Sequence, residues 1–247
     1  NADMNYYGDG GLSKIYFGAA TANEFGLSIG INASYLFGGL NRRKQLVYND
    51  ASFLNSRSNS KINLKGYYYE LGLLYKITKN ESDVFAIGFT ANNNSTIRAK
   101  KSEIVESFEF SGFIEDPVIT EEKITWGDIT LPRYTSMGIS YNKDNKWLIV
   151  ADYSMQDWAD YTMFDESDNL ANSIRISGGM QYTPEYNSVT KYYKRMDYRF
   201  GATYSNTPLQ FDNRQLTEKS ISFGFGIPVK KSRTKYDFSC TLGQRGT

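Results

Sequence analysis

The sequence predicts an all-β protein, a transmembrane antiparallel up-and-down β-barrel formed as a single domain by residues 1–247. Three observations predict this class. Apolar residues alternate with small or polar residues along most of the chain, which is the period of a β-strand. Short and long connections also alternate, as do the periplasmic turns and extracellular loops of outer-membrane barrels. Aromatic residues make up 15% of the chain and gather near the ends of the predicted strands.

The stretch SISFGFGIP (220–228) shows the alternation most clearly. One face of this predicted strand carries Ile221, Phe223, Phe225 and Ile227, whereas the other carries only serine and glycine. The polar face of a water-soluble sheet usually carries charged and long polar side chains instead. In a membrane barrel the apolar face meets lipid and the other face meets the lumen. Small residues on the second face therefore leave space inside the barrel.

The same pattern predicts about ten strands, at residues 11–19, 24–38, 67–77, 85–92, 134–141, 147–158, 173–182, 197–204, 220–228 and 235–243. Tight turns, in which Asn and Asp adopt left-handed conformations, are expected at 20–23, 78–82, 142–146 and 230–234. Longer polar loops at the opposite rim are expected at 39–60, 93–131, 157–171 and 205–215. The stretch GDGG (8–11) is interpreted as a further turn, because no strand–loop–helix context supports a phosphate-binding loop.

Composition argues against several classes of function. The 28 basic and 27 acidic residues nearly cancel, so no nucleic-acid partner is expected. No apolar run is long enough for a transmembrane helix. The chain has no histidine and a single cysteine, Cys240, which the alternation places on the lipid-facing side. Without a disulfide, a metal-binding cluster or a nucleophile–base pair, we expect neither an enzyme nor a cofactor.

Charged residues on the predicted lumen face are the candidates for a functional site. They are Glu70, Asp152, Arg175 and Arg199. One interpretation is a polar network that stabilises the barrel interior. The other is that Arg175 or Arg199 contacts the anionic head group of a ligand passing through the lumen.

Aromatic residues at the strand ends predict two girdles at the membrane interfaces. Beside the short turns lie Tyr75, Tyr141, Trp147, Tyr182 and Tyr236. Beside the long loops lie Tyr35, Phe37 and Trp158. Membrane lipids are therefore expected partners, and the expected location is the outer membrane of a Gram-negative bacterium.

Several stretches resemble the FadL/TodX-type outer-membrane transporters, in particular their Bacteroidetes-type members. They are NKDNKWLIVADYSMQDWADY (142–161), DITLPRYTSMGISY (128–141), SISFGFGIPV (220–229) and the closing GQRGT (243–247). The resemblance implies a 14-stranded barrel whose lumen is plugged by an N-terminal hatch. It also implies uptake of hydrophobic small molecules such as long-chain fatty acids. The hatch region is missing here, so the resemblance implies a fragment that lacks both ends of the barrel.

Two alternatives stay open at this point. A soluble β-sandwich or a lipocalin-like barrel shows the same period of two, although its strands are usually shorter and its polar faces carry more charge. In function, the barrel could instead serve as a subunit of an outer-membrane secretion or surface-attachment complex, of the type IX kind. Its long loops would then bind protein partners.

Overall fold

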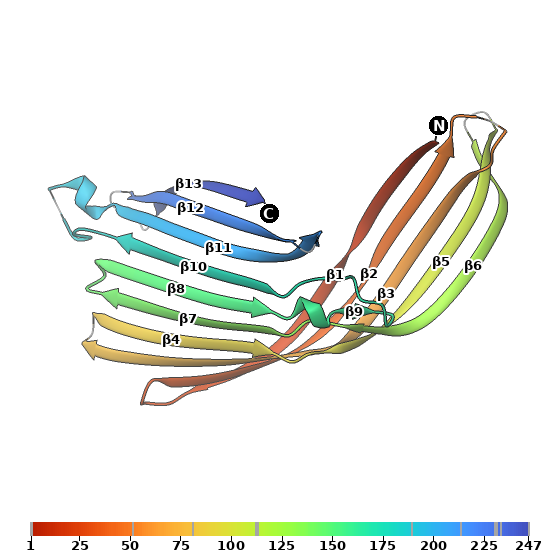
Figure 1. The fold of residues 1–247 in the computed structure, drawn as a ribbon. Helices are drawn as coiled ribbons and strands as arrows, with labels where there is room; N and C mark the ends of the chain where they lie inside the picture. Colours follow the sequence, from red (N-terminus) through yellow and green to blue (C-terminus); the bar gives the residue numbers. More distant parts are fainter. Residues whose placement is uncertain are drawn as a thin grey trace.

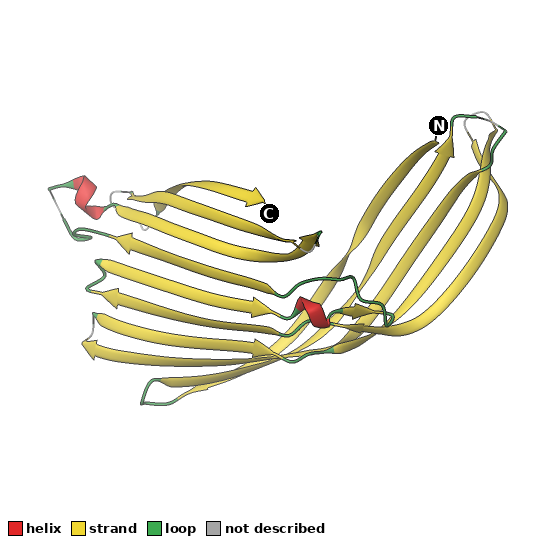
Figure 2. Ribbon diagram, in the orientation of Figure 1, coloured by secondary structure: helices red, strands yellow, loops and turns green. Residues whose placement is uncertain are grey.

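The structure, a computed structural model, describes residues 2–50, 52–80, 82–111, 114–188, 190–212, 214–229, 232 and 234–246. Most of these residues lie in strands (Figures 1 and 2). The strands are β1 (Ala2–Ala22), β2 (Leu27–Tyr48), β3 (Asn55–Asn80), β4 (Asp83–Asn92), β5 (Thr96–Ser111), β6 (Ile114–Thr130), β7 (Tyr134–Lys143), β8 (Trp147–Gln156), β9 (Thr162–Met163), β10 (Ser173–Tyr182), β11 (Asp197–Phe211), β12 (Arg214–Pro228) and β13 (Lys235–Gly246). Two short 3-10 helices, η1 (Trp158–Asp160) and η2 (Tyr192–Arg195), lie in connections. No helix among the described residues is long and apolar enough to span a membrane.

The strands form one antiparallel sheet in which chain neighbours mostly pair as hairpins. The predicted all-β, up-and-down class is therefore confirmed. The sheet contains 13 strands rather than about ten. It is curved but open, because β1 and β13 pair on one side only among the described residues.

Strand β3 divides the sheet into two regions. It pairs with β2 from Ser56 to Tyr75. On its other side, the half from Glu70 onward pairs with β4, and the half from Asn55 to Lys65 pairs with β5. We call the region with β4, β7, β8 and β10–β13, together with the adjoining halves of β1–β3, the membrane wall. The rest, which β5, β6 and the far halves of β1–β3 form, we call the extension; it rises away from the wall in Figure 1.

The extension occupies two stretches that were predicted to be loops. Residues 39–60 belong mostly to β2 and β3, and most of 93–131 belongs to β5 and β6. Most of the predicted loop at 205–215 likewise belongs to β11 and β12. These predictions were wrong because charged and polar residues were taken as a sign of loops. Charged residues also fit the water-exposed face of a strand.

The predicted turn at GDGG (8–11) was also wrong, because these residues lie inside β1. Gly10 has a φ of +125°, and a Cβ there would lie 2.3 Å from the carbonyl oxygen of Gly39. The glycines thus allow two strands to approach closely rather than reverse the chain.

A buried apolar cluster lies in the extension, where β3, β5 and β6 meet. It consists of Ile62, Leu64, Ile97, Ala99 and Ile129. The connection between β8 and β10 folds over this cluster, and β9 within it pairs with β6. Packed against the cluster from this connection are Tyr161, Met163 and Phe164. Burial raises the pKa of the Tyr161 phenol, because the ionised form is poorly solvated there. The predicted loop at 157–171 is therefore the cover of a core.

The apolar face of β3 changes sides at the boundary between the two regions. In the membrane wall, Tyr69, Leu71 and Leu73 lie on the face that we call outer, opposite Glu70 and Gly72 on the inner face. In the extension the outer face carries polar and charged side chains, among them Lys61, Asn63 and Lys65. The buried Ile62 and Leu64 lie there on the inner face. Because side chains alternate along a strand, this inversion needs no change in register.

Candidate functional site

The inner face of the membrane wall carries a polar cluster around Glu70. The Nζ atom of Lys14 on β1 lies 2.8 Å from the Oε2 atom of Glu70 on β3. The same ammonium group stands 5.2 Å from the centre of the Tyr68 ring. The side chain of Asn92 on β4 donates a hydrogen bond to the hydroxyl of Tyr68 and accepts one from the backbone N–H of Tyr134 on β7. We call these five residues the Glu70 cluster.

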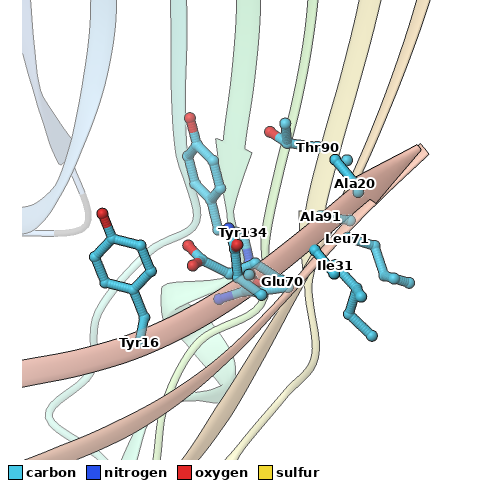
Figure 3. Close-up of a pocket in the computed structure, with 14 residues that line it drawn as sticks. Tyr16, Ala20, Ile31, Glu70, Leu71, Thr90, Ala91 and Tyr134 are labelled. Carbon is cyan, nitrogen blue, oxygen red and sulfur yellow. Dashed lines mark hydrogen bonds between the residues drawn. The ribbon is translucent and has the colours of Figure 1, made fainter. Parts of the chain in front are cut away.

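The Glu70 cluster borders a pocket of about 550 Å³ on the inner face. Figure 3 shows Tyr16, Glu70 and Tyr134 around it, contributed by β1, β3 and β7. Small residues make room for it. A Cβ on Gly18 would lie 2.1 Å from the Oδ1 atom of Asn32, and one on Gly72 would meet no atom closer than 4.0 Å. The pocket suits a small ligand with one polar group, because carboxylate, ammonium and phenol groups meet at its edge.

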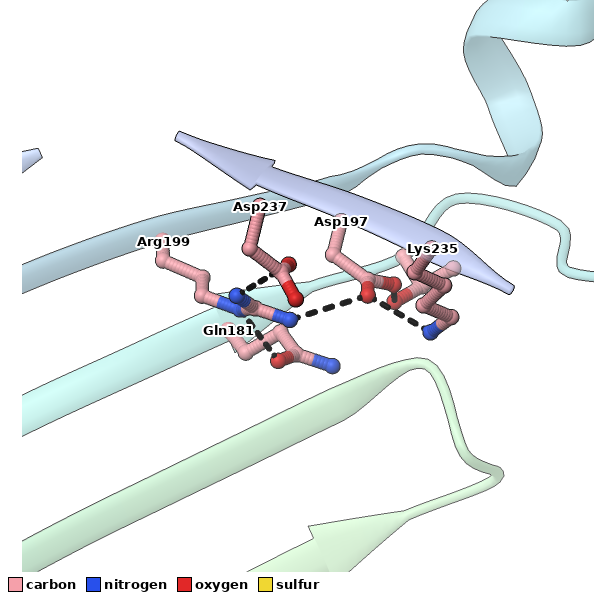
Figure 4. A network of polar contacts seen from close by, with 6 residues as sticks. Gln181, Asp197, Arg199, Lys235 and Asp237 are labelled. Atoms are coloured by element: carbon pink, nitrogen blue, oxygen red, sulfur yellow. Dashed lines mark hydrogen bonds and ion pairs between the residues drawn. The ribbon is translucent and has the colours of Figure 1, made fainter. Parts of the chain in front are cut away.

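A second polar network joins β10, β11 and β13 near the rim with the short turns (Figure 4). Asp197 is only 1% exposed. Its Oδ2 atom lies 2.7 Å from the Nζ atom of Lys235 and 3.2 Å from the Nη2 atom of Arg199. Its Oδ1 atom accepts a hydrogen bond of 2.7 Å from Thr183. Arg199 also pairs with Asp237 at 2.7 Å. We call this group, with Gln181 bonded to Arg199 Nε, the rim network.

Glycine on β12 makes the rim network possible. In the register, Gly226 lies between Asp197 on β11 and Asp237 on β13. A Cβ on Gly226 would lie 2.7 Å from an oxygen of Asp237 and 3.1 Å from one of Asp197. The side chain of Arg199 therefore passes over β12 to reach β13. The bare face of SISFGFGIP leaves space for these charges.

The four predicted inner-face residues thus have different surroundings. Glu70 belongs to the Glu70 cluster and Arg199 to the rim network, while Asp152 and Arg175 lie on the inner face of β8 and β10. Within the described part of the chain, neither Asp152 nor Arg175 makes an ion pair or a side-chain hydrogen bond. The structure therefore does not bring the four together. Lys14, Asp197 and Lys235 were missed, because the pairs Lys14–Glu70 and Lys235–Asp197 join residues 56 and 38 positions apart in the sequence.

The aromatic residues predicted at the short-turn rim lie on the outer face. The rings of Trp147 and Tyr182 are 4.2 Å apart on neighbouring strands. The other three residues share this face in the strand register; they are Tyr75, Tyr141 and Tyr236. Cys240 lies on it as well, opposite Phe223, and is exposed.

Aromatic rings also gather on the outer face where the extension begins. Tyr35 stacks on Phe37 with ring centres 5.9 Å apart and lies 5.4 Å from Tyr67. Trp158, predicted for this girdle, instead lies in η1, where its ring contacts Tyr161 of the covering connection. The boundary on this side is thus marked by residues of β2 and β3.

An outer face that is apolar over one strand length, a small-residue inner face and short turns at one rim define the class of protein, which is a β-barrel protein of the outer membrane. The BamG family model matches residues 1–247. The chain therefore belongs to the BamG family.

Solved structures share this fold at low sequence identity. The CymD monoaromatic hydrocarbon channel aligns with a TM-score of 0.60 and 16% identity, covering all of this chain and 72% of that one. The RagAB peptide transporter aligns with a TM-score of 0.56 and 10% identity, covering 98% of this chain. This chain corresponds to only 31% of the length of the RagAB chain. No curated protein matches the sequence.

These comparisons refine the family resemblance drawn from the sequence. The likeness to CymD, which has a FadL-like fold, bears out the resemblance at the level of architecture. The family that matches over the whole chain is BamG, and membership of the FadL family itself is not established.

Proposed function

We propose that this protein is a structural subunit of an outer-membrane barrel-assembly complex and that its extension binds protein partners outside the membrane. The observation that carries the proposal is the extension, a set of paired strands with a buried core beyond the lipid-facing wall. The name of the BamG family, which points to barrel assembly, supports the same role. The type IX-like role considered from the sequence also makes the barrel a subunit of a larger complex, but of one for secretion or surface attachment.

The extension has the properties of a protein-binding surface. Its strands continue from the wall, and Ile97 and Phe108 in it are 1% and 0% exposed. An ordered surface loses less conformational entropy on binding than a mobile loop does. At its tip, between β2 and β3, Phe53 and Leu54 are 59% and 43% exposed. Tyr48 is also exposed and its ring lies 5.4 Å from that of Phe53, so these residues form an apolar patch of the kind that marks contact sites.

The test is site-specific photocrosslinking in cells, with the full-length protein. A photoreactive residue at Phe53 is expected to crosslink to a protein, and the native complex is expected to contain other barrel-assembly components. The matched control places the same photoreactive residue at position 71, where Leu71 is 55% exposed on the outer face of the membrane wall. This position should not crosslink to a protein with the yield seen at Phe53. A protein that purifies alone, with no crosslink from Phe53, would contradict the proposal.

A second candidate function is passage of small hydrophobic molecules such as fatty acids through the lumen. It is favoured by the pocket of about 550 Å³ beside Glu70 and by the fold shared with a hydrocarbon channel. Glu70 and Lys14 are better placed to contact a ligand than Arg199, because the rim network holds the Arg199 guanidinium in two ion pairs. The buried apolar cluster of the extension is not an alternative ligand site, because the β8–β10 connection covers it.

Native mass spectrometry of the protein extracted in mild detergent separates the two functions. A near-stoichiometric fatty acid or hydrocarbon that is lost in Glu70→Gln would favour transport. Asp152→Asn is the matched control, because Asp152 lies on the same inner face outside the lining of the pocket. A stable protein partner without bound lipid would favour the assembly subunit.

A further inference from the structure

We propose that the outer face of the extension binds the phosphate groups of lipids in the surrounding outer leaflet. The site consists of four cations on β3 and β5, namely Lys61, Lys65, Arg98 and Lys100, which we call the basic patch. This inference depends on the membrane position of the wall and not on the protein partner proposed above.

Two cations of the basic patch, Lys65 and Arg98, lie at the depth of the lipid head groups. The ring of Tyr67 belongs to the aromatic group at the boundary. Going along β3 from the wall into the extension, Lys65 is the next residue on the outer face. Two residues of strand correspond to about 7 Å. The polar head-group layer on each side of a bilayer is about 5–8 Å thick. The side chains of Lys65 and of Arg98 opposite it therefore end among the head groups, and those of Lys100 and Lys61 lie farther from the wall.

The cations of the basic patch are close together and, among the described residues, have no acidic partner. Lys65 lies directly opposite Arg98 in the β3–β5 register, and Lys100 follows on the same face. Like charges opposite one another destabilise a sheet. Among the described residues, none of the four cations makes an ion pair or a side-chain hydrogen bond. Asp128 lies across from Arg98 on β6 without forming an ion pair.

Two other cations of the extension are paired with glutamates, unlike the four cations of the basic patch. Arg57 lies 2.7 Å from Glu106, and Lys101 lies 3.0 Å from Glu103. The Lys100 ammonium instead stands 5.5 Å from the centre of the Trp126 ring, which is a contact typical of membrane interfaces. The charge that would complement the patch is thus an anion from outside the chain, and lipid phosphates are the anions found at this depth.

The test is a lipid titration followed by native mass spectrometry, with the full-length protein extracted from outer membranes in mild detergent. The probes are bisphosphorylated lipid A, the same lipid without phosphates, and inorganic phosphate. We expect the phosphorylated lipid to bind at least tenfold more tightly than its dephosphorylated counterpart. Each Lys or Arg near a membrane surface contributes about 1 kcal/mol to the binding of anionic lipid, which corresponds to about fivefold. Lys65→Gln with Arg98→Gln should therefore weaken binding about 25-fold.

Two variants keep the test specific. Lys65→Arg retains the charge and should bind the lipid as the natural protein does. Lys219→Gln removes a single outer-face cation that stands 5.7 Å from the Tyr204 ring on another part of the wall, and it should change binding less than twofold. Resistance to unfolding by SDS without heating verifies that each variant is folded.

Three results would overturn the proposal. The first is equal binding of the two lipids, and the second is unchanged binding by the double variant. The third is displacement of the lipid by inorganic phosphate at equal concentration, which would assign the patch to the free ion. If the double variant lost a protein partner while its lipid binding stayed unchanged, the patch would be a protein contact.

Discussion

The membrane wall and the extension are built from the same strands but have opposite polarity. On β3, the outer face is apolar at Leu71 and Leu73 and polar at Lys61 and Asn63. The inner face carries Glu70 in the wall and the buried Ile62 in the extension. The backbone pairing with β2 is continuous through this change. The surroundings of each region, lipid for the wall and water for the extension, therefore decide which face of the strand is apolar. The same strand geometry occurs in both regions.

The largest effect is expected from the core of the extension. Ile97 is 1% exposed and packs against Gly66. A Cβ on Gly66 would lie 2.8 Å from the Cγ2 atom of Ile97. Ile97→Ala should cost about 2–5 kcal/mol, because the packed surroundings leave a cavity. Hydrogen exchange measured by mass spectrometry should show faster exchange across β5 and the covering connection.

The matched control for the core is an isoleucine on the lipid-facing side. Ile31 is 50% exposed on the outer face of the membrane wall. Lipid tails can fill the space that Ile31→Ala leaves, so the loss should be clearly smaller than for Ile97→Ala. Equal losses at the two positions would contradict the assignment of lipid to one face and a protein core to the other.

A charge placed on one face of one strand should give a strongly position-dependent effect. Leu71 lies midway between Tyr67 and Tyr75 on the outer face of β3. Leu71→Arg should destabilise the protein by about 2–4 kcal/mol, as cations do at the middle of a bilayer. Asn63→Arg, on the same face in the extension, should cost clearly less, about 0.2–1 kcal/mol, because the new charge lies in water and is repelled by Lys100 directly opposite it. Guanidinium unfolding in lipid vesicles would measure both, and similar losses would place the two residues in the same solvent.

The wall could be predicted from the sequence because lipid leaves one simple pattern. The apolar faces of the strands around Leu71 and Phe223 were assigned correctly, as was the turn in which Asp144 and Asn145 adopt φ values of 54° and 52°. The extension could not be predicted in the same way. Its outer face is charged, so the stretch 39–60 has the composition of a loop.

The candidate site was predictable only in part, for a different reason. Arg199 could be placed on the inner face by alternation alone, and in the structure it lies on that face as part of the rim network. Its partner Asp237 is 38 residues away in sequence. No local pattern shows that Gly226 stands between the two strands to let them meet. Contacts across three strands depend on the register, which a single sequence leaves undetermined.

Filling the glycine position in the rim network should have a moderate effect. Gly226→Ala brings a Cβ to 2.7 Å from Asp237 and 3.1 Å from Asp197. The side chains must move apart, and overpacking of this kind costs about 1–3 kcal/mol. The control is Gly243→Ala on the inner face of β13, where the nearest atoms lie at 3.4 Å. If the two variants melt at the same temperature, the network does not depend on the open position at Gly226.

The smallest effect is expected at the short-turn rim, where Lys194 lies 3.0 Å from Glu185 in water. The hydrogen bond from Lys194 lowers the pKa of Glu185 below its ordinary value, and the same contact raises the pKa of Lys194. The contribution of Glu185 is therefore present above the ordinary glutamate pKa of about 4.3 and is lost as the pH falls through the lower pKa of the folded state. The side chains of Lys194 and Glu185 are 36% and 54% exposed, so salt screens their attraction.

Glu185→Gln should therefore lower the melting temperature slightly at neutral pH and low salt. The difference should disappear at high salt, and it should also disappear in acid once Glu185 of the natural protein is protonated. Lys194→Met should give the same dependence on salt, because either change removes the same pair. A difference between variant and natural protein that persisted in acid or in high salt would mean that the turn is shielded from water. The short-turn rim would then resemble the covered core of the extension rather than an exposed edge of the wall.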